Sequence, residues 1–362
     1  MRDVVTERMG RNSRENVVQW GKTHGGNTMK KLIVTLATAI LLALAVHSEG
    51  IKIYSPIAQN MLIDKNNFVR YSPVNMFDGD SATVYAVTFS EVDKKAYLLD
   101  IRFAEPAVFD ELTIKAGYFD QKYFGMNDRI KDMTVEIWNC FNNDYEKSLS
   151  LKDIQKEQSL YSGGKIIATK IRIKVSSVYA GSKWDDLVIS DLNFYLGGRR
   201  QGVSFGSGKC ISGEDFKWYE YDEQGRLAEE RHQAGHAGGG TTVYKYENGK
   251  TYAAGKSWEA DDDFRPQFTE VEELPDKEYE YFFKDGKKIA VKRSQTDWRG
   301  TSFYISQYIY DERGLARCLI RICENTNWAD DYTEYTYNEK GQLVKEVGYE
   351  DATIYTQRYT EE

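Results

Sequence analysis

Apolar residues alternate with polar ones along most of the chain between Ile51 and Leu196. Every second side chain of a β-strand points to the same face, so this period of two predicts strands rather than helices. The polar partners, such as Lys170, Arg172 and Lys174, occupy the other face, as in antiparallel sheets with one solvated side. Many short strands in this segment predict an all-β fold, a β-sandwich or jelly roll. The clearest runs are Leu99, Ile101, Phe103; Met133, Val135, Ile137; and Ile171, Ile173, Val175.

A second pattern recurs in residues 211–362. Two tyrosines separated by one residue are followed by a turn with Gly, five times at intervals of roughly 25 to 35 residues. Tyr at i and i+2 places both rings on one strand face, and the Gly supplies the left-handed backbone of a hairpin turn. Single hairpins are marginal in water, so we predict an antiparallel sheet of hairpins that pair side by side. The pairs are Tyr219/Tyr221, Tyr244/Tyr246, Tyr279/Tyr281, Tyr308/Tyr310 and Tyr335/Tyr337.

The Gly-rich residues 197–210 separate the two patterns and are predicted to form a linker. The predicted domains are therefore a sandwich over residues 51–196 and a repeat domain over residues 211–362.

The N-terminal region is typical of an exported protein. Lys30 and Lys31 precede an apolar run that ends at Ala45, which predicts a secretory signal peptide over residues 29–48. A membrane anchor is the competing interpretation, but the run is shorter than the about 20 residues that span a bilayer. Residues 1–28 are interpreted as upstream sequence from a mis-assigned start. We expect a secreted, periplasmic or cell-surface protein with no membrane insertion after signal cleavage.

Charge and histidine content argue against several classes of function. Residues 1–48 carry seven basic and three acidic residues, so the rest of the chain has 41 basic against 53 acidic residues, a net charge of −12. Such a surface repels phosphates and anionic headgroups, which disfavours nucleic acids and membrane surfaces as partners. An enzyme needs a positioned acid and base, or a nucleophile with its base. Beyond residue 48 the histidines are His232 and His236, in a Gly-rich run that disfavours a helix, so we predict no catalytic centre.

Export permits disulfides, and the four cysteines Cys140, Cys210, Cys318 and Cys323 allow three full pairings. The sequence does not choose among the pairings. Cys318 and Cys323 lie in one strand-like run at an odd separation, so we expect their side chains on opposite faces of the strand.

Three motifs occur in order within the first domain: Asn75, Asp78, Gly79, Asp80 and Thr83; Gly117 and Tyr118 followed by residues 127–132; and Tyr179, Gly181, residues 183–186 and residues 189–191. With these motifs the domain resembles the discoidin, or coagulation factor 5/8 type C, superfamily, and more specifically the glycan-binding domain found beside bacterial NAD glycohydrolases. The resemblance implies a jelly-roll β-sandwich with a binding function. It does not imply NAD cleavage, which belongs to the separate catalytic domain. Tyr85, Ala116 and Asp191 stand where the family usually has Trp, Asn and Glu.

Aromatic rings and hydrogen-bonding side chains gather in the second and third motifs. Aromatic faces stack on the apolar faces of sugar rings, and polar side chains bind sugar hydroxyls. The alternative is a structural role: Tyr118 and Tyr179 as core residues, and Arg129 in an ion pair with Asp132 or Asp185. The predicted ligand-binding residues are Tyr118, Phe119, Tyr123, Asn127, Arg129, Tyr179, Lys183 and Trp184.

Four residues of the first and third motifs carry hard oxygen ligands: Asp78, Asp80, Thr83 and Asp191. In the wider superfamily the matching loop often holds a structural calcium that a late acid closes, so the resemblance implies a calcium site here. The alternative is turn chemistry alone, because Asp and Thr side chains cap their own backbone in tight loops.

Residues 216–360 resemble the YD repeats of secreted bacterial shell and wall-associated proteins, most closely at residues 221–227 and 337–343. Such repeats are scaffolding, which implies a spacer or docking surface. We therefore hypothesise an exported, non-catalytic protein whose first domain recognises a glycan or another extracellular ligand. The alternative is a structural protein–protein interaction protein of the cell envelope with no sugar ligand.

Overall fold

The computed structural model describes residues 50–139, 142–207, 215–234, 238–257, 267–271, 279–297, 300–324 and 332–349. The chain divides into two compact units, Met1–Gly50 and Ile51–Glu362, and every element below belongs to the second. The predicted signal peptide and the residues before it lie outside the described part. The all-β prediction is confirmed, because the described residues form strands and three short 3-10 helices. Among these helices, none has the length and apolarity needed to cross a membrane.

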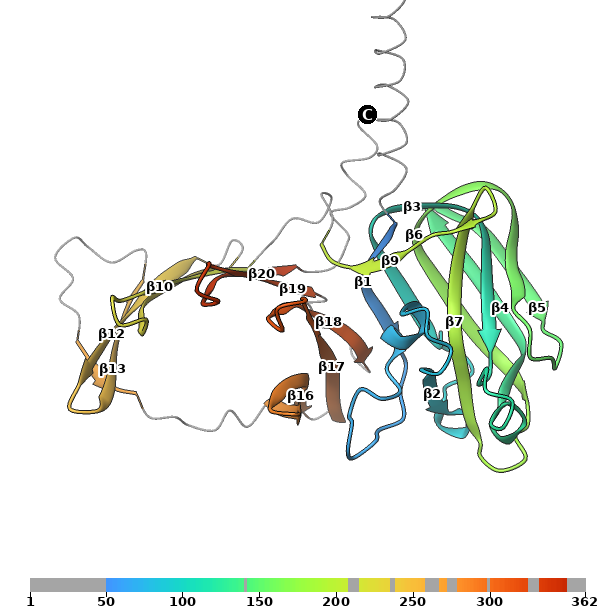
Figure 1. Cartoon of the computed structure of the whole chain (residues 1–362), viewed down its shortest axis with the longest axis horizontal. Helices are drawn as coiled ribbons and strands as arrows, with labels where there is room; N and C mark the ends of the chain where they lie inside the picture. Colours follow the sequence, from blue (N-terminus) through green and yellow to red (C-terminus); the bar gives the residue numbers. More distant parts are fainter. Residues whose placement is uncertain are drawn as a thin grey trace, which may run out of the picture. The chain divides into compact units, whose positions relative to one another are not determined.

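Seven strands build a sandwich of two antiparallel sheets (Figure 1). The first half of β3 pairs with β1 and with the second half of β6, whereas its second half pairs with β7 and the first half of β6. One sheet therefore runs β5–β4–β6–β3–β1 and the other β6–β3–β7–β2. The strands are β1 Ile51–Ala58, β2 Tyr85–Thr88, β3 Leu99–Ala116, β4 Arg129–Asn139, β5 Asn142–Ser150, β6 Gln158–Tyr179 and β7 Asp186–Leu196.

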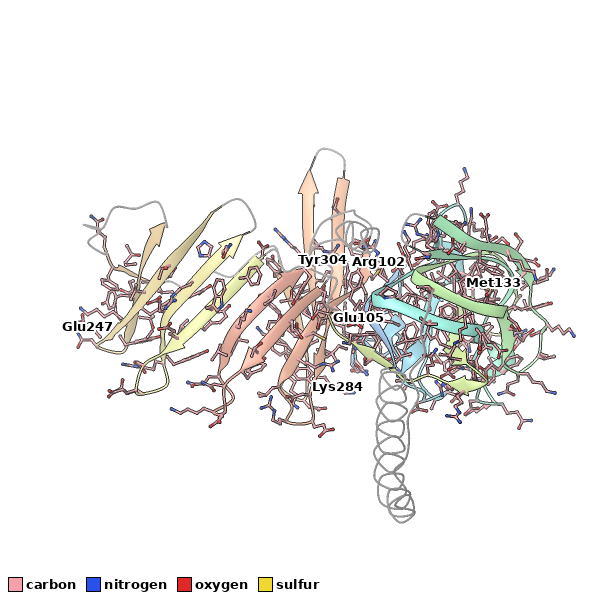
Figure 2. The ribbon with its side chains drawn as sticks, turned by 90° about the horizontal axis from the view of Figure 1, so that it is seen from above. Arg102, Glu105, Met133, Glu247, Lys284 and Tyr304 are labelled. Atoms are coloured by element: carbon pink, nitrogen blue, oxygen red, sulfur yellow. The ribbon has the colours of Figure 1, made fainter. Side chains whose placement is uncertain are left out.

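The alternating apolar residues of these strands form the core between the two sheets. Phe109 and Phe194 are fully buried and meet edge to face, with ring centroids 5.3 Å apart. Met133, labelled within the sandwich in Figure 2, is 1% exposed. The 3-10 helices lie in connecting segments and are η1 Pro73–Phe77, η2 Phe89–Glu91 and η3 Phe124–Met126.

The segment predicted as a Gly-rich linker differs in the structure. Gly197 and Gly198 take positive φ angles of 59° and 72°, which form a tight turn into strand β8, Arg199–Arg200, and β8 pairs with β7. Strand β9, Val203–Phe205, then pairs in parallel with β1. Val203 and Phe205 pack against the core, and this apolar burial holds residues that the glycines alone would leave mobile. Residues 197–205 therefore extend the sandwich.

The repeat domain is one continuous sheet of eleven strands. Hydrogen bonding gives the order β15–β16–β17–β18–β19–β20–β10–β11–β12–β13–β14, with all pairs antiparallel. The strands are β10 Asp215–Tyr221, β11 Leu227–Ala234, β12 Gly239–Glu247, β13 Lys250–Ser257, β14 Thr269–Glu270, β15 Tyr279–Lys284, β16 Lys287–Asp297, β17 Gly300–Tyr310, β18 Ala316–Glu324, β19 Tyr332–Tyr337 and β20 Leu343–Tyr349.

The predicted hairpin turns are confirmed. Gly225, Gly249, Gly286, Gly314 and Gly341 each follow a tyrosine pair and take φ angles between 75° and 78°. Only Gly enters this left-handed region without a steric penalty, so the Gly of each repeat sets the hairpin.

The register places the tyrosine pairs on one face of the sheet. Tyr335 lies opposite Glu346 on β20, and Glu346 lies opposite Lys217, two residues before Tyr219. Directly opposed residues of an antiparallel pair share a face, so these tyrosines are on the same side. The rings of Tyr308 and Tyr335 stack with centroids 6.4 Å apart, and the Tyr219 hydroxyl donates to Glu346 at 3.1 Å.

The repeat sheet packs against the sandwich within a single apolar core. Ala58 at the end of β1 pairs with Cys323 of β18, and the rings of Phe68 and Phe282 stack. Cys318 and Cys323 are buried free thiols. The prediction that they face opposite sides is wrong: both pair with odd-numbered β17 residues, Ile309 and Ile305, because a bulge in β18 adds one residue between them. Cys140 and Cys210 lie outside the described residues.

Candidate functional site

A cavity of about 800 Å³ opens at the loops that follow the sandwich strands. Its walls combine aromatic rings with a few polar side chains, which is the usual composition of a small-molecule site. The residues that line it are Leu62, Asn67, Val69, Arg70, Tyr71, Asn75, Ala82, Thr83, Val84, Ala86, Tyr118, Asp120, Tyr123, Asn127, Trp184, Asp186, Val188, Lys284, Ile289 and Gln307.

The loop with Arg70 and Tyr71 is fixed by the start of η1. Ser72 caps this 3-10 helix through its side chain. The Asn75 side-chain amide donates to the carbonyl oxygens of Arg70 at 2.7 Å and Val84 at 2.9 Å, which ties the loop to the residue before β2. The Arg70 guanidinium binds Asp64 at 2.8 Å and lies 5.4 Å from the centre of the Tyr71 ring.

Tyr118 lies on the floor of the cavity. It packs with Tyr71 against the small buried cluster of Val84, Ala86 and Val188. Burial raises the pKa of Tyr118, and the neighbouring Tyr71 hydroxyl raises it further, so the phenol stays protonated and able to donate. The Tyr123 ring lies 5.8 Å from the Tyr118 ring. Two phenol rings therefore form one aromatic floor.

Trp184 is held by backbone contacts between two loops. The backbone N–H of Trp184 donates to the Met126 carbonyl at 2.9 Å, and the backbone N–H of Gly181 donates to the buried Asp128 carboxylate at 2.7 Å. A Cβ at Gly181 would lie 2.5 Å from two carbonyl oxygens, so only Gly permits this approach. The Trp184 side chain stays 38% exposed and lines the cavity, and the Lys183 ammonium lies 4.1 Å from the centre of its ring.

Asp186 supplies a carboxylate to the cavity wall. Partial burial raises its pKa, and the negative charges of Asp185 and Asp128 raise it further. The Asp185 side chain accepts from the Ser90 hydroxyl at 3.0 Å, outside the cavity. Asp186 is therefore the one of this acidic pair that is placed to accept hydrogen bonds from a ligand.

The structure brings together half of the predicted ligand-binding residues. Tyr118, Tyr123, Asn127 and Trp184 line the cavity, and Lys183 lies over the ring of Trp184. Phe119 packs edge to face against Phe124, and neither of these two residues lines the cavity.

The other two predicted ligand-binding residues have structural roles. Arg129 is 7% exposed and binds the Asp153 carboxylate through two nitrogens, at 2.6 Å and 2.9 Å. The predicted alternative of an ion pair is therefore correct in kind, but the partner is Asp153 rather than Asp132 or Asp185. The Tyr179 hydroxyl donates to the Leu151 carbonyl at 2.9 Å. Neither side chain lines the cavity.

The predicted calcium ligands do not form one donor set. Asp78 accepts from the Thr83 hydroxyl at 2.6 Å and from the Asp80 N–H at 2.8 Å, which is the turn chemistry of the alternative. Among the described residues there is no group of three or more acidic, His or Cys side chains arranged to hold a metal.

Basic side chains surround the fourth predicted ligand, Asp191. This carboxylate is fully buried and binds Lys115 at 2.9 Å and the Ser81 hydroxyl at 2.9 Å. Its other oxygen faces the Arg200 guanidinium at 3.8 Å. Lys115 and Arg200 therefore already place two positive charges at the carboxylate that was predicted to complete the calcium site, so these residues do not fit a calcium ion.

Several residues that line the cavity were not among the predicted ligand-binding residues. Arg70 and Tyr71 lie a few residues before Asn75, the start of the first motif, and Asp186 lies within the third, so their positions near or within the motifs were the available signal. Lys284, Ile289 and Gln307 come from the repeat domain, and no local pattern indicates that they reach the cavity.

Among known proteins, a family match covers the first domain. No curated protein matches the chain. Among solved structures, the chain is similar to the arabinofuranosyltransferase AftD from Mycobacteria, with 11% identity and a TM-score of 0.30, over 82% of this chain and 23% of that one. It is also similar to truncated AlyQ with CBM32 and alginate lyase domains, with 11% identity and a TM-score of 0.27, over 72% of this chain and 79% of that one. The chain thus spans less than a quarter of the length of AftD. Residues 51–195 match the model of the NAD glycohydrolase translocation F5/8 type C domain, which confirms the discoidin-like resemblance for that part of the chain.

Proposed function

We propose that this protein is an exported, non-catalytic binding protein whose cavity recognises a glycan. The observation that carries the proposal is the lining of the cavity: Tyr71, Tyr118, Tyr123 and Trp184 surround it together with Asn75, Asn127 and Asp186. Aromatic faces suit sugar rings, and amide and carboxylate groups suit hydroxyls. The F5/8 type C match of residues 51–195 supports a binding role.

Binding of the purified chain to a broad glycan panel tests this role. We expect Trp184→Ala to weaken binding to any captured glycan at least tenfold, because aromatic anchors dominate such sites, and Trp184→Phe to restore part of the loss. Phe283→Ala is the matched control, since Phe283 is 58% exposed but does not line the cavity. The absence of binding to every glycan on the panel would remove the support for this function. Release of product from a bound oligosaccharide would contradict the non-catalytic part.

A second candidate function is protein–protein interaction in the cell envelope. A separate hollow of about 500 Å³ is lined by Ile63, Phe68, Phe282, Phe283 and Phe303, and exposed Phe283 and Ile63 contribute apolar surface there. Phe283→Asp should abolish co-purification of a defined envelope partner while leaving glycan binding intact. Retention of the partner by this variant argues against a protein-binding role for this hollow.

A further inference from the structure

The repeat domain forms part of the cavity wall, although the family match ends at residue 195. Lys284, Ile289 and Gln307, from the hairpin of β15 and β16 and from β17, line the same space as Tyr118 and Trp184. The site proposed above is therefore composite, and the sandwich alone supplies an incomplete wall.

This wall is held in place by specific contacts. The Ser72 hydroxyl donates to the Gln307 side-chain oxygen at 2.5 Å, next to the loop that carries Tyr71. The stacked rings of Phe68 and Phe282 lie at the same junction, and Ile289 packs against the common core. A wall fixed by apolar burial and by a hydrogen bond is preorganised, which reduces the entropy lost when a ligand binds.

Charge is distributed unequally between the two walls. The sandwich wall carries the carboxylates of Asp120 and Asp186, and its basic residue Arg70 is already paired with Asp64. The repeat-domain wall carries one charged lining residue, Lys284. A ligand that spans the cavity meets hydrogen-bond acceptors on one side and an ammonium group on the other.

Lys284 is available to a ligand. It is exposed at the last position of β15, before the Asp285–Gly286 turn (Figure 2), and its side chain has no ion pair or hydrogen bond among the described residues. Lys287 lies directly opposite it in the ladder, and like charges so placed are unfavourable unless an anion screens them. The Lys287 ammonium turns toward the Tyr310 ring, 5.4 Å from its centre, and does not line the cavity.

We propose that the ligand is an acidic saccharide, with its sugar ring on the aromatic floor and its anionic group bound by Lys284 of the repeat domain. This inference rests on the glycan-binding function proposed above. It assigns the repeat domain a role in specificity in addition to that of a spacer. Asp186 fixes the orientation, because it repels an anionic group from the sandwich wall and accepts hydroxyl hydrogen bonds instead.

A matched pair of probes tests the inference: tri-galacturonic acid and its fully methyl-esterified form, which differ in charge at the carboxyl groups. Binding of the full chain is measured by calorimetry at low and at physiological salt. We expect the acid to bind three- to fivefold more tightly than the ester, since a partly exposed ion pair adds only a modest gain, and salt to reduce the difference. Lys284→Ala should remove this preference and leave the affinity for the ester unchanged.

Lys287→Ala is the matched control and should keep the preference, because this lysine does not line the cavity. Equal binding of acid and ester by the unmodified chain would overturn the acidic ligand while leaving the proposed glycan function standing. A preference that survives Lys284→Ala would overturn the role of Lys284. If neither probe binds, a panel of neutral and sulfated saccharides decides: capture of neutral sugars alone refutes this inference, and capture of none refutes the proposed function as well.

Discussion

The sandwich and the repeat sheet use the same antiparallel pairing but exclude water in different ways. The sandwich encloses its apolar residues between two sheets, so Phe109 and Phe194 are fully buried. The repeat sheet is a single layer whose paired tyrosines stay partly exposed and contact each other and carboxylates through ring stacking and hydroxyl groups. The closed core of the sandwich holds its loops rigidly enough to build a site. The repeat sheet is stabilised by contacts among its own tyrosines and leaves its edges and turns accessible.

The strongest test of this difference is a substitution that creates a cavity in the core of the sandwich. Phe109→Ala removes a fully buried ring and should lower the free energy of unfolding by about 3–5 kcal/mol. Urea denaturation followed by tryptophan fluorescence measures the loss. A cost below about 1 kcal/mol would mean that the sandwich core is not packed as described.

The buried charges of the sandwich give the next largest effect. Lys115→Met leaves the buried Asp191 carboxylate with Ser81 and the more distant Arg200, and should cost about 2 kcal/mol or more, because an uncompensated buried charge is expensive. Thermal unfolding with calcium and with chelator completes the test. We expect the same midpoint in both for the unmodified chain, and a stabilisation by calcium would show that the ion binds despite the two basic side chains.

In the single layer the corresponding change should be milder. Tyr308→Leu keeps apolar volume but removes the ring stacked on Tyr335, so we expect a loss of about 1 kcal/mol. Denaturant titration beside Phe109→Ala compares the two regions directly. A loss as large as that of Phe109→Ala would erase the distinction between them.

The smallest expected effect is a pH dependence at Asp186. Its pKa is raised in the folded chain, so the folded state binds this proton more tightly than the unfolded state and stability falls as pH rises from about 4 through the raised pKa. Asp186→Asn removes this dependence and should be slightly more stable than the unmodified chain at pH 7 but not below about pH 4. Unfolding midpoints measured across this range check the sign, and a constant difference at all pH values would refute it.

Local periodicity predicted most of the fold, because burial of every second residue and a Gly in each hairpin turn are local requirements. The alternation at Ile171 and Ile173 and the turn at Gly225 both appear as expected. Bulges are not local in this sense: the extra residue between Cys318 and Cys323 shows only in the pairing with β17.

The candidate site was less predictable, because it depends on partners far apart in the sequence. Trp184, predicted as a ligand-binding residue, lines the cavity, whereas Arg129 in the same set of motifs is bound by Asp153. Asp191 likewise gains Lys115 and Arg200 as partners. A sequence shows that such residues carry charge, but only the assembled fold shows which charge neutralises them.

The pairing of β20 with β10 has a consequence for how the protein is made. Lys217 and Glu346 are neighbours in the ladder although most of the repeat domain separates them along the chain. During synthesis β10 to β13 emerge early and keep one edge open until the last strand arrives, so this ladder forms late and slowly. A chain truncated before Leu343 would therefore carry two sheet fragments with unpaired edge strands, which are prone to aggregation.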